Sequence, residues 1–199
     1  MADQKITAFP AAATPLTGAE IVPLVQGGAN VRSTIALIGQ YAISTLQNYG
    51  AFQDIDGPQT AAANTVTQLR INTIDFTQGV TKVGNRISMT NAGVYSIIIS
   101  LQLLNDKANY DTLTLWPVIN GTAAAGAASV IGVSEKKGGI DGQSILTVQY
   151  TYQFAAGGYF EFNWYNAAGN AAIVTFPASL VAPIHPAAAG VILSVIQVA

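Results

Sequence analysis

The sequence predicts an all-β protein, a two-sheet sandwich preceded by a small N-terminal arm. Short apolar runs separated by Gly, Asn and Pro turns recur throughout residues 51–199. In the clearest runs apolar and polar side chains alternate, which is the pattern of a strand with one buried face. Apolar periodicity of helical length ends at Leu46. A succession of about eight or more such strands is typical of a β-sandwich.

Residues 1–50 form the predicted arm, which contains only four charged residues. Its Pro- and Ala-rich stretch, residues 9–15, favours extended backbone. Residues 21–26 predict a short strand, and Pro23 places that strand at a sheet edge because proline cannot donate a hydrogen bond to a ladder. A turn is expected at residues 27–30.

A helix is predicted over residues 35–46, where apolar side chains recur at helical spacing. Ser33 or Thr34 can cap its N-terminus. The arm is too small to bury a core of its own, so it is either a structural part of the main domain or an anchor that a partner protein orders. We favour the anchor, and expect the partner to contact the apolar side chains of Ile21, Leu24, Val25, Ile35 and Ile38.

Three regions of the sandwich show strand alternation most clearly. In residues 94–103 one face is apolar and consists of Tyr95, Ile97, Ile99, Leu101 and Leu103. In residues 148–154 the equivalent face consists of Val148, Tyr150, Tyr152 and Phe154. After a Gly-rich turn, the next strand is expected to bury Phe160, Phe162 and Trp164. Shorter runs predict further strands near residues 70–77, 82–90, 113–119, 129–133, 172–176 and 191–198.

The low charge of the chain indicates an assembly. Charged residues make up 9% of the sequence, whereas a typical soluble domain has about 25%. Free surfaces are normally covered by charge, while obligate interfaces are richer in apolar groups. We therefore expect a subunit whose surface is covered in large part by partner chains.

Composition also excludes several functional classes. A net charge of −2 is too small to drive binding to a nucleic-acid backbone. Because the chain has no Cys and one His, it has no disulfides, no thiol nucleophile and no multi-histidine metal site. Apolar stretches are interrupted well before the ~20 residues that a membrane-spanning helix needs, and the first residues lack the features of a signal peptide. We expect no nucleic acid, no membrane and no cofactor.

The residues that could carry chemistry each have a simpler structural interpretation. His185 lies in a loop bracketed by prolines, and no Gly-x-Ser-x-Gly elbow accompanies it, so we expect a loop or interface histidine and no enzyme. Asp54 and Asp56 could begin a calcium loop, but the twelfth position, Thr65, offers no carboxylate. A turn before Pro58 is the favoured alternative.

Three other motifs are interpreted in the same way. The sequence Asn120-Gly121-Thr122 matches a glycosylation sequon, but Asn-Gly is also a preferred hairpin turn. Residues 135–139 hold the charge cluster of the sandwich, which predicts a solvated loop tip, with receptor contact as the alternative. The aromatic residues of the two strands near residues 150–164 are expected in the core rather than on a carbohydrate platform.

Residues 87–97 resemble the strand pair of complement-q-like and tumour-necrosis-factor-like (TNF-like) jelly rolls, which carry Gly-x-Tyr at the start of a central strand, here Gly93 and Tyr95. Residues 150–160 resemble the later aromatic and Gly-rich turn, with Gly158 where the family has Asp. The resemblance implies a two-sheet jelly roll and a homotrimer, and some trimers of this family bind calcium. In such a trimer we expect the interface to include Ser96, Ile98, Gln149 and Thr151.

Residues 5–28 resemble a leader that fibres, spikes and capsid-surface proteins of tailed bacteriophages share, and residues 191–198 are similar to the end of such phage domains. This resemblance implies a structural protein on the outer surface of the virion, with other virion proteins as partners. The short chain, without a long shaft, favours a capsid decoration or cement protein that bridges capsomers. The alternatives are a short tail or head fibre whose jelly-roll tip binds a host receptor, and an enzyme such as a depolymerase.

Overall fold

The structure is a computed structural model that describes residues 17, 19, 21–26, 28–39 and 47–199. The chain divides into two compact units, Met1–Leu46 and Gln47–Ala199. This boundary lies a few residues before position 50, where the sequence analysis places it, because Tyr49 and Gly50 already belong to the first strand of the sandwich.

The first unit contains an antiparallel hairpin of β1 (Ile21–Gln26) and β2 (Ala29–Thr34). The strand predicted over residues 21–26 is confirmed. The predicted turn is shorter than expected, because Ala29 already pairs with Gln26 and begins β2. Gly28 takes a positive φ of 81°, a conformation that favours glycine.

A short helical segment, residues 35–39, follows β2. Its N-terminus is capped as predicted, since the Thr34 hydroxyl accepts a hydrogen bond from the Leu37 N–H at 3.2 Å. Residues 40–46 of the predicted helix lie outside the described residues.

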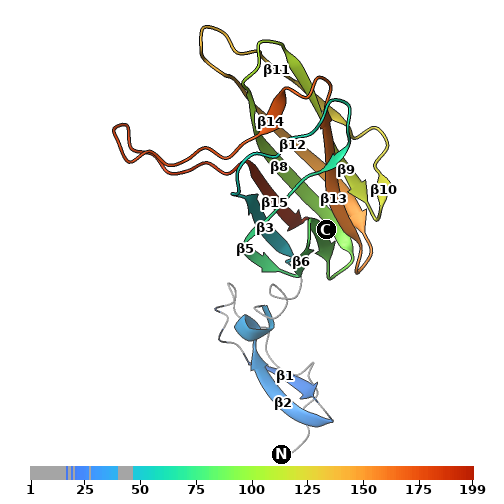
Figure 1. The fold of residues 1–199 in the computed structure, drawn as a ribbon. Helices are drawn as coiled ribbons and strands as arrows, with labels where there is room; N and C mark the ends of the chain where they lie inside the picture. The colour runs from blue at the N-terminus through green and yellow to red at the C-terminus, as the bar shows by residue number, and fades with distance from the viewer. Residues whose placement is uncertain (1–16, 18, 20, 27, 40–46) are drawn as a thin grey trace, which may run out of the picture. The chain divides into compact units, whose positions relative to one another are not determined.

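The second unit is a sandwich of two antiparallel sheets (Figure 1). One sheet has six strands in the order β12-β8-β15-β3-β5, with β14 also paired to β8. Its strands are β3 (Tyr49–Asp54), β5 (Thr73–Gln78), β8 (Gly93–Asn105), β12 (Gly142–Phe154), β14 (Ala171–Ile173) and β15 (Val191–Gln197).

The other sheet has seven strands in the order β10-β9-β13-β7-β6, with β11 also paired to β9 and β4 to β13. Its strands are β4 (Thr67–Gln68), β6 (Val80–Val83), β7 (Arg86–Met89), β9 (Asp111–Ile119), β10 (Thr122–Ala123), β11 (Ser129–Val133) and β13 (Tyr159–Asn166). From β7 to β13 the chain crosses between the sheets four times, from β7 to β8, β8 to β9, β11 to β12 and β12 to β13, and it also crosses among β3, β4, β5 and β6 and from β13 to β14. This alternation is the strand order of the predicted jelly roll.

The core lies between the two sheets, where the predicted strand faces meet. The apolar residues of β8 and β13 that the alternation selects are buried, with Trp164, Phe160 and Phe162 fully inaccessible. Tyr150 and Tyr152 of β12 are partly buried and pack against this core. The aromatic residues are therefore core, as predicted, and do not form a carbohydrate platform.

The Gly-x-Tyr at the start of β8 has a physical reason in the structure. A Cβ on Gly93 would lie 2.4 Å from the Gln197 amide nitrogen and 2.7 Å from the Ala199 carbonyl oxygen. The fully buried Tyr95 donates a hydrogen bond to the Asn91 carbonyl at 2.8 Å and accepts one from the Asn48 amide at 3.1 Å. Burial raises the pKa of Tyr95, and the Asn48 hydrogen bond opposes that shift in part.

Several strand boundaries differ from those predicted. The strand expected over residues 82–90 is a hairpin of β6 and β7, which turns at Gly84 with a φ of 60°. Arg70 and Ile71 lie outside β5 because side chains take their backbone N–H groups: Arg70 donates to Gln59 and Ile71 donates to Asn85. Strand β3 was not predicted, because its sequence has no clear alternation.

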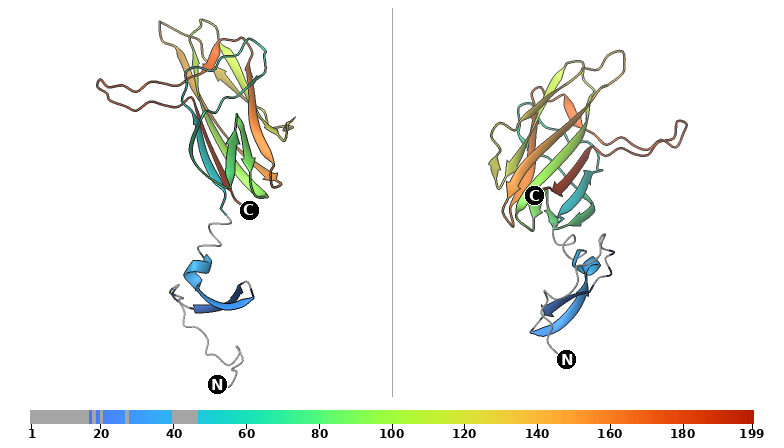
Figure 2. Two further views of the ribbon diagram at one scale, coloured as in Figure 1. Left: turned by 60° about the horizontal axis from the view of Figure 1, so that its bottom comes forward. Right: turned by 180° about the vertical axis from the view of Figure 1, so that it is seen from behind.

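A hairpin-like segment between β14 and β15, residues 174–190, projects from the sandwich on the side of β3 and β5 (Figures 1 and 2). We call it the finger. Its two arms are joined by backbone hydrogen bonds between Phe176 and Ala188 and between Ser179 and His185. The strand predicted over residues 172–176 is therefore only partly present, since β14 ends at Ile173.

Candidate functional site

The outward-facing surface of the six-stranded sheet is the candidate functional site, and we call it the assembly face. The two 13-residue strands β8 and β12 contain no charged residue, and neither do β14 and β15. In the whole sheet the charged residues are Asp54 and Asp75, and Asp54 is buried. A face built this way can be covered by protein without burying unpaired charge.

Two pairs of polar side chains on the assembly face are hydrogen-bonded to each other within the chain. The Gln149 amide donates to the Ser96 hydroxyl at 2.9 Å, and the hydroxyls of Ser100 and Thr147 are 3.0 Å apart. These pairs bridge neighbouring strands β8 and β12. Because each of these four groups already has one hydrogen bond within the chain, contact with a partner would not leave any of them without a hydrogen bond.

Between the polar pairs the assembly face exposes isolated apolar side chains. Ile98 on β8 lies directly opposite Ser194 of β15 and Gln149 of β12. Strand β15 contributes two half-exposed residues, Ile192 and Ile196. A monomer in water leaves this apolar area uncovered, whereas burial would contribute about 25 cal/mol per Å².

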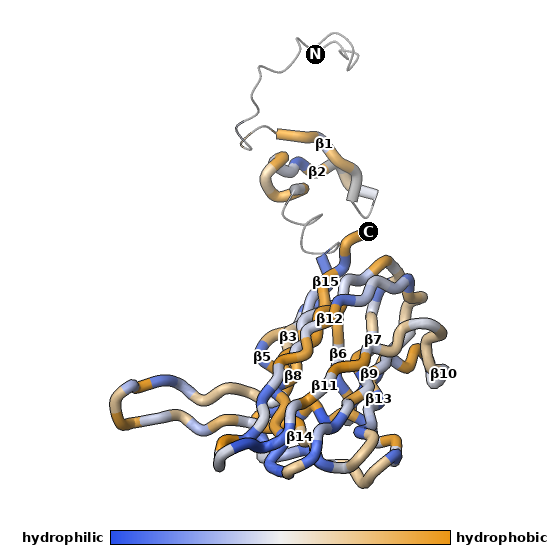
Figure 3. Tube along the Cα trace, turned by 90° about the horizontal axis from the view of Figure 1, so that it is seen from above, coloured by the Kyte–Doolittle hydropathy of each residue, from blue (hydrophilic) through white to orange (hydrophobic). Residues whose placement is uncertain are grey.

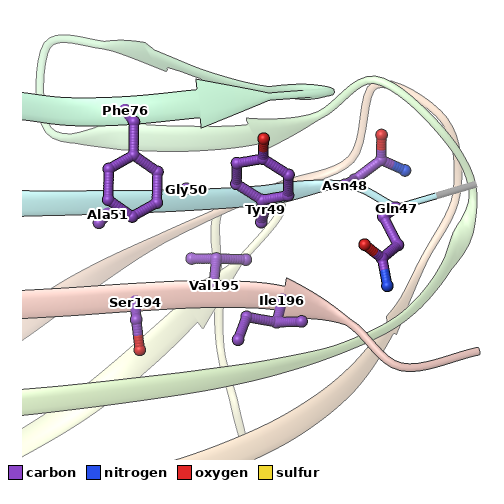
Figure 4. Close-up of a pocket in the computed structure, with 9 residues that line it drawn as sticks. All are labelled: Gln47, Asn48, Tyr49, Gly50, Ala51, Phe76, Ser194, Val195 and Ile196. Atoms are coloured by element: carbon purple, nitrogen blue, oxygen red, sulfur yellow. The ribbon is translucent and has the colours of Figure 1, made fainter. Parts of the chain in front are cut away.

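A shallow depression of about 280 Å³ lies on this face where β3, β5 and β15 meet (Figure 4). Phe76 and Tyr49 form its aromatic side, with ring centroids 5.9 Å apart in an edge-on arrangement. Ile196 and Ala51 complete its apolar lining, and the Tyr49 hydroxyl donates to Gln78 at 3.1 Å. Its lining suits an apolar side chain of a partner protein, since the side chains of Figure 4 offer neither a nucleophile paired with a base nor a metal-ligand set.

The other sheet presents a different surface. Its exposed strands carry Lys82, Arg86 and Glu161. Arg86 pairs with Glu161 at 3.0 Å and lies 4.4 Å from the centre of the Tyr159 ring. Since charge is depleted at interface centres, the assembly face is the better candidate for contact between copies.

The structure places all four predicted interface residues on the assembly face. Ser96 is half-buried, while Ile98, Gln149 and Thr151 are exposed. The sequence analysis missed the further apolar residues of the face, which are Ile145, Ile192, Ile196 and Phe76. The signal that could have found the two β15 residues is the period of two in residues 191–197, which leaves even-numbered positions on the outer side.

The predicted partner-binding residues lie in the first unit. Ile21, Leu24 and Ile38 are exposed, and Ile35 is half-buried. The Val25 side chain lies outside what the structure describes. A cavity beside these residues is lined by Ile21, Arg32, Ser33, Thr34 and Leu37.

The Asp54 carboxylate is held by protein groups rather than exposed to a cation. Arg70 forms a two-pronged ion pair with it, each N···O distance being 3.0 Å, and the Gln59 amide donates at 2.7 Å. The hydrogen bond to Asp54 also raises the pKa of Arg70. Arg70 further binds the carbonyl oxygens of Asp56 and Gly57. The loop that could have begun a calcium site is thus closed by an arginine.

Asp111 at the start of β9 is a second buried carboxylate. It accepts backbone N–H hydrogen bonds from Thr112, Ala168, Asn170 and Ala171 at 2.7–3.0 Å. Burial alone would raise the pKa of Asp111, but the four donors outweigh it and hold the pKa below its ordinary value. Asp111 is therefore a structural anion that joins β9 to the loop before β14.

The remaining motifs have structural roles in the places predicted for them. Asn120 and Gly121 both take positive φ, 49° and 83°, and form the tight turn from β9 to β10. In the charged loop, Lys136 pairs with Asp141 at 2.6 Å and Lys137 with Glu135 at 2.9 Å. Such exposed pairs contribute little to stability.

His185 lies on the exposed finger, where its ring nitrogen Nδ1 is 2.9 Å from the Pro186 carbonyl oxygen. Among the described residues, no three His, Cys, Asp or Glu side chains are grouped closely enough to hold a metal ion. Within that same part of the chain, no helix has the length and hydropathy to cross a bilayer.

Comparisons with known proteins address the fold. No protein-family model and no curated protein matches the chain. Among solved structures the chain is similar to two crystal structures of murine APRIL, at pH 8.5 and pH 8.0, with TM-scores of 0.46 and 0.47 and 10% sequence identity in each case. Each likeness covers 76% of this chain and 99% of the other. On its strand order, the second unit is a two-sheet jelly roll.

Proposed function

We propose that this chain is a homotrimeric structural protein of the outer surface of a tailed-bacteriophage particle, and that it acts as a capsid decoration or cement protein. The observation that carries the trimer is the assembly face, in which long strands without charge present satisfied polar pairs and exposed isoleucines. The placement on a phage particle is supported by the likeness of residues 5–28 to phage leader sequences. We propose no enzymatic activity.

The energetic reason for a trimer follows from the surface of the sandwich. Exposed isoleucines on a flat face carry a hydration cost that contact between copies removes. The fixed backbone and the paired side chains lose little conformational freedom on contact, which lowers the entropic cost of association. A closed ring also covers this face on every copy, as cyclic symmetry requires.

Sedimentation tests this proposal. We expect the full chain to sediment as a trimer at micromolar concentration, and Ile98→Glu to sediment as a monomer at the same concentration. The substitution places a carboxylate at the centre of the uncharged face, where burial in the trimer would leave it unpaired. Ile98 points away from the core, so circular dichroism of the variant should match that of the parent.

The matched control is Val130→Glu, which adds the same charge to an exposed apolar position on β11 of the other sheet. This variant should remain trimeric. A parent protein that sediments as a monomer would overturn the proposed trimer. If Ile98→Glu and Val130→Glu dissociate to the same extent, the interface is not on the assembly face.

The first unit is proposed to attach the trimer to the particle. Ile21, Leu24 and Leu37 are exposed on a hairpin and a helical segment that are too small for a core of their own. A segment of this kind gains its stability by packing on something else. Three copies joined in one trimer would multiply weak attachments through effective concentration.

Truncation tests the attachment. Removal of residues 1–46 should leave a folded trimer that no longer co-pellets with particles lacking this protein, whereas the full chain does. The cut precedes Gln47 because a cut at residue 51 would also remove Asn48 and the start of β3. Equal co-pelleting of both proteins would show that the jelly roll itself binds the particle, and binding confined to purified tails would favour the fibre alternative.

A further inference from the structure

The tip of the finger exposes an unusual amount of apolar surface. Leu180 is 87% exposed, Val181 78% and Ile184 76%, although all three lie within one short turn. The last charged residue before the tip is Glu161, and none follows it to residue 199. Two pairs of backbone hydrogen bonds join the arms, and an isolated two-stranded ribbon is only marginally stable.

The finger is long enough to reach beyond its own sheet. The seven or so residues between Gly190 and the tip span about 23 Å at ~3.3 Å per residue, while β5 lies two strands from β15, about 10 Å away. Figures 1 and 2 show the finger leaving the sandwich on the side of β3 and β5, and Figure 3 shows that its end is hydrophobic. The tip therefore lies beyond the edge of its own sheet.

A complementary apolar residue lies at the opposite edge of the same sheet. Ile145 on the edge strand β12 is 60% exposed. It pairs in register with Gln102 of β8, and the Gln102 N–H donates to the carbonyl of Gly190, the last residue of the finger. The base of the finger and Ile145 therefore lie on one row that runs across the strands.

We propose that the finger packs across the subunit boundary in the trimer, with Leu180, Val181 and Ile184 of one copy covering Ile145 at the β12 edge of the next copy. This inference rests on the proposed trimer. In a cyclic assembly whose axis runs along the strands, neighbouring copies are related by rotation without displacement along that axis. Two groups that lie on one row of a copy therefore have the same position along the axis in every copy. A finger that follows this row consequently reaches the next copy at the position of Ile145 along the axis.

The chemistry of both surfaces favours a second copy of this chain as the occupant. Strand β12 has no charged residue, and the finger has none either. A contact between them would bury apolar groups without desolvating an ion. Each copy would donate one finger and accept one, which closes the ring and leaves none of the three tips uncovered.

Cross-linking tests the proposal, because the chain contains no Cys and any thiol can be placed at will. We expect the double variant Val181→Cys with Ile145→Cys, treated with copper phenanthroline, to form covalent dimers and trimers on denaturing gels that reductant reverses. Disulfides form only between Cα atoms closer than about 7 Å. The matched control, Val181→Cys with Val130→Cys, places the second thiol on the other sheet and should give no trimer band.

The outcomes separate this inference from the proposed trimer. If the double variant sediments as a trimer but gives no cross-linked trimer, the finger does not contact the β12 edge and the inference is wrong while the trimer stands. If the parent protein itself sediments as a monomer, both are wrong. Flotation with phosphatidylcholine vesicles that is lost in the variant Leu180→Ser, Val181→Ser, Ile184→Ser would assign the tip to a membrane instead and would also overturn the inference.

Discussion

Replacement of Trp164 by Ala is expected to lower the free energy of unfolding by about 3–5 kcal/mol. Trp164 is fully buried between the sheets, and its indole N–H has no hydrogen-bond partner among the described residues. The loss would thus come from packing and from the cavity left behind. Urea denaturation followed by circular dichroism measures it, at a protein concentration held constant because any association of copies adds to apparent stability.

Two further variants identify the cause of that loss. Trp164→Phe keeps most of the side-chain volume and removes the unpaired N–H together with part of the indole ring, so it should cost clearly less, about 1.5 kcal/mol or below. Trp116→Ala removes the other tryptophan, which is half-buried on the outer side of β9 and has an edge-on contact with Tyr165. A loss for Trp164→Ala no larger than that for Trp116→Ala would contradict the core assignment.

Replacement of Asp111 by Asn is expected to lower the free energy of unfolding by about 2–4 kcal/mol at neutral pH. The carboxylate accepts four backbone hydrogen bonds, whereas an amide presents an NH₂ group to some of the same donors. Asp106→Asn is the control, because Asp106 is an exposed acid at the beginning of the same β8–β9 connection. That control should leave stability nearly unchanged.

The same residue gives a pH dependence with a definite sign. The pKa of Asp111 is lower in the folded than in the unfolded chain, so its contribution is fully present above the unfolded pKa of about 3.9. It is lost as the pH falls from that value through the folded pKa. As the pH is lowered below about 5, the free energy of unfolding of the parent protein should therefore fall more steeply than that of Asp111→Asn. Parallel pH profiles for the two proteins would contradict the assignment.

The sequence predicts those parts of the fold that follow from side-chain alternation. Strands β8, β12 and β13 each have one face that is apolar over most of its length, and all three are present with that face inward. Strand β3 lacks such a face, since Gly50 and Ala51 dilute its pattern, and only pairing with β15 and β5 makes it a strand. Local pattern therefore identifies strands with large inward side chains and misses those that depend on their neighbours.

The candidate site was predictable in part for the same reason. Outward positions on β8 and β12 follow directly from alternation, so Ser96, Ile98, Gln149 and Thr151 were found. The contribution of Phe76 depends on a bulge in the pairing of β3 and β5, which no local pattern reveals. The ion pair of Asp54 with Arg70 likewise joins residues whose contact follows from the fold rather than from a motif.

The hydrogen bonds around Tyr95 also bring the two ends of the sandwich together. The Gln197 N–H donates to the Asn48 carbonyl at 2.8 Å, and the Val94 N–H donates to the Ala199 carbonyl at 2.6 Å. Residues 47 and 199 therefore leave the jelly roll from the same end, a geometry that tolerates circular permutation. A short Gly-Ser linker could join them, with new ends opened in the loop at residues 135–141, which lies outside the regular strands. A peptide fused after residue 199 would leave the sandwich close to residue 47, where the first unit joins it. A peptide inserted at residues 135–141 would instead leave the sandwich from the loop between β11 and β12.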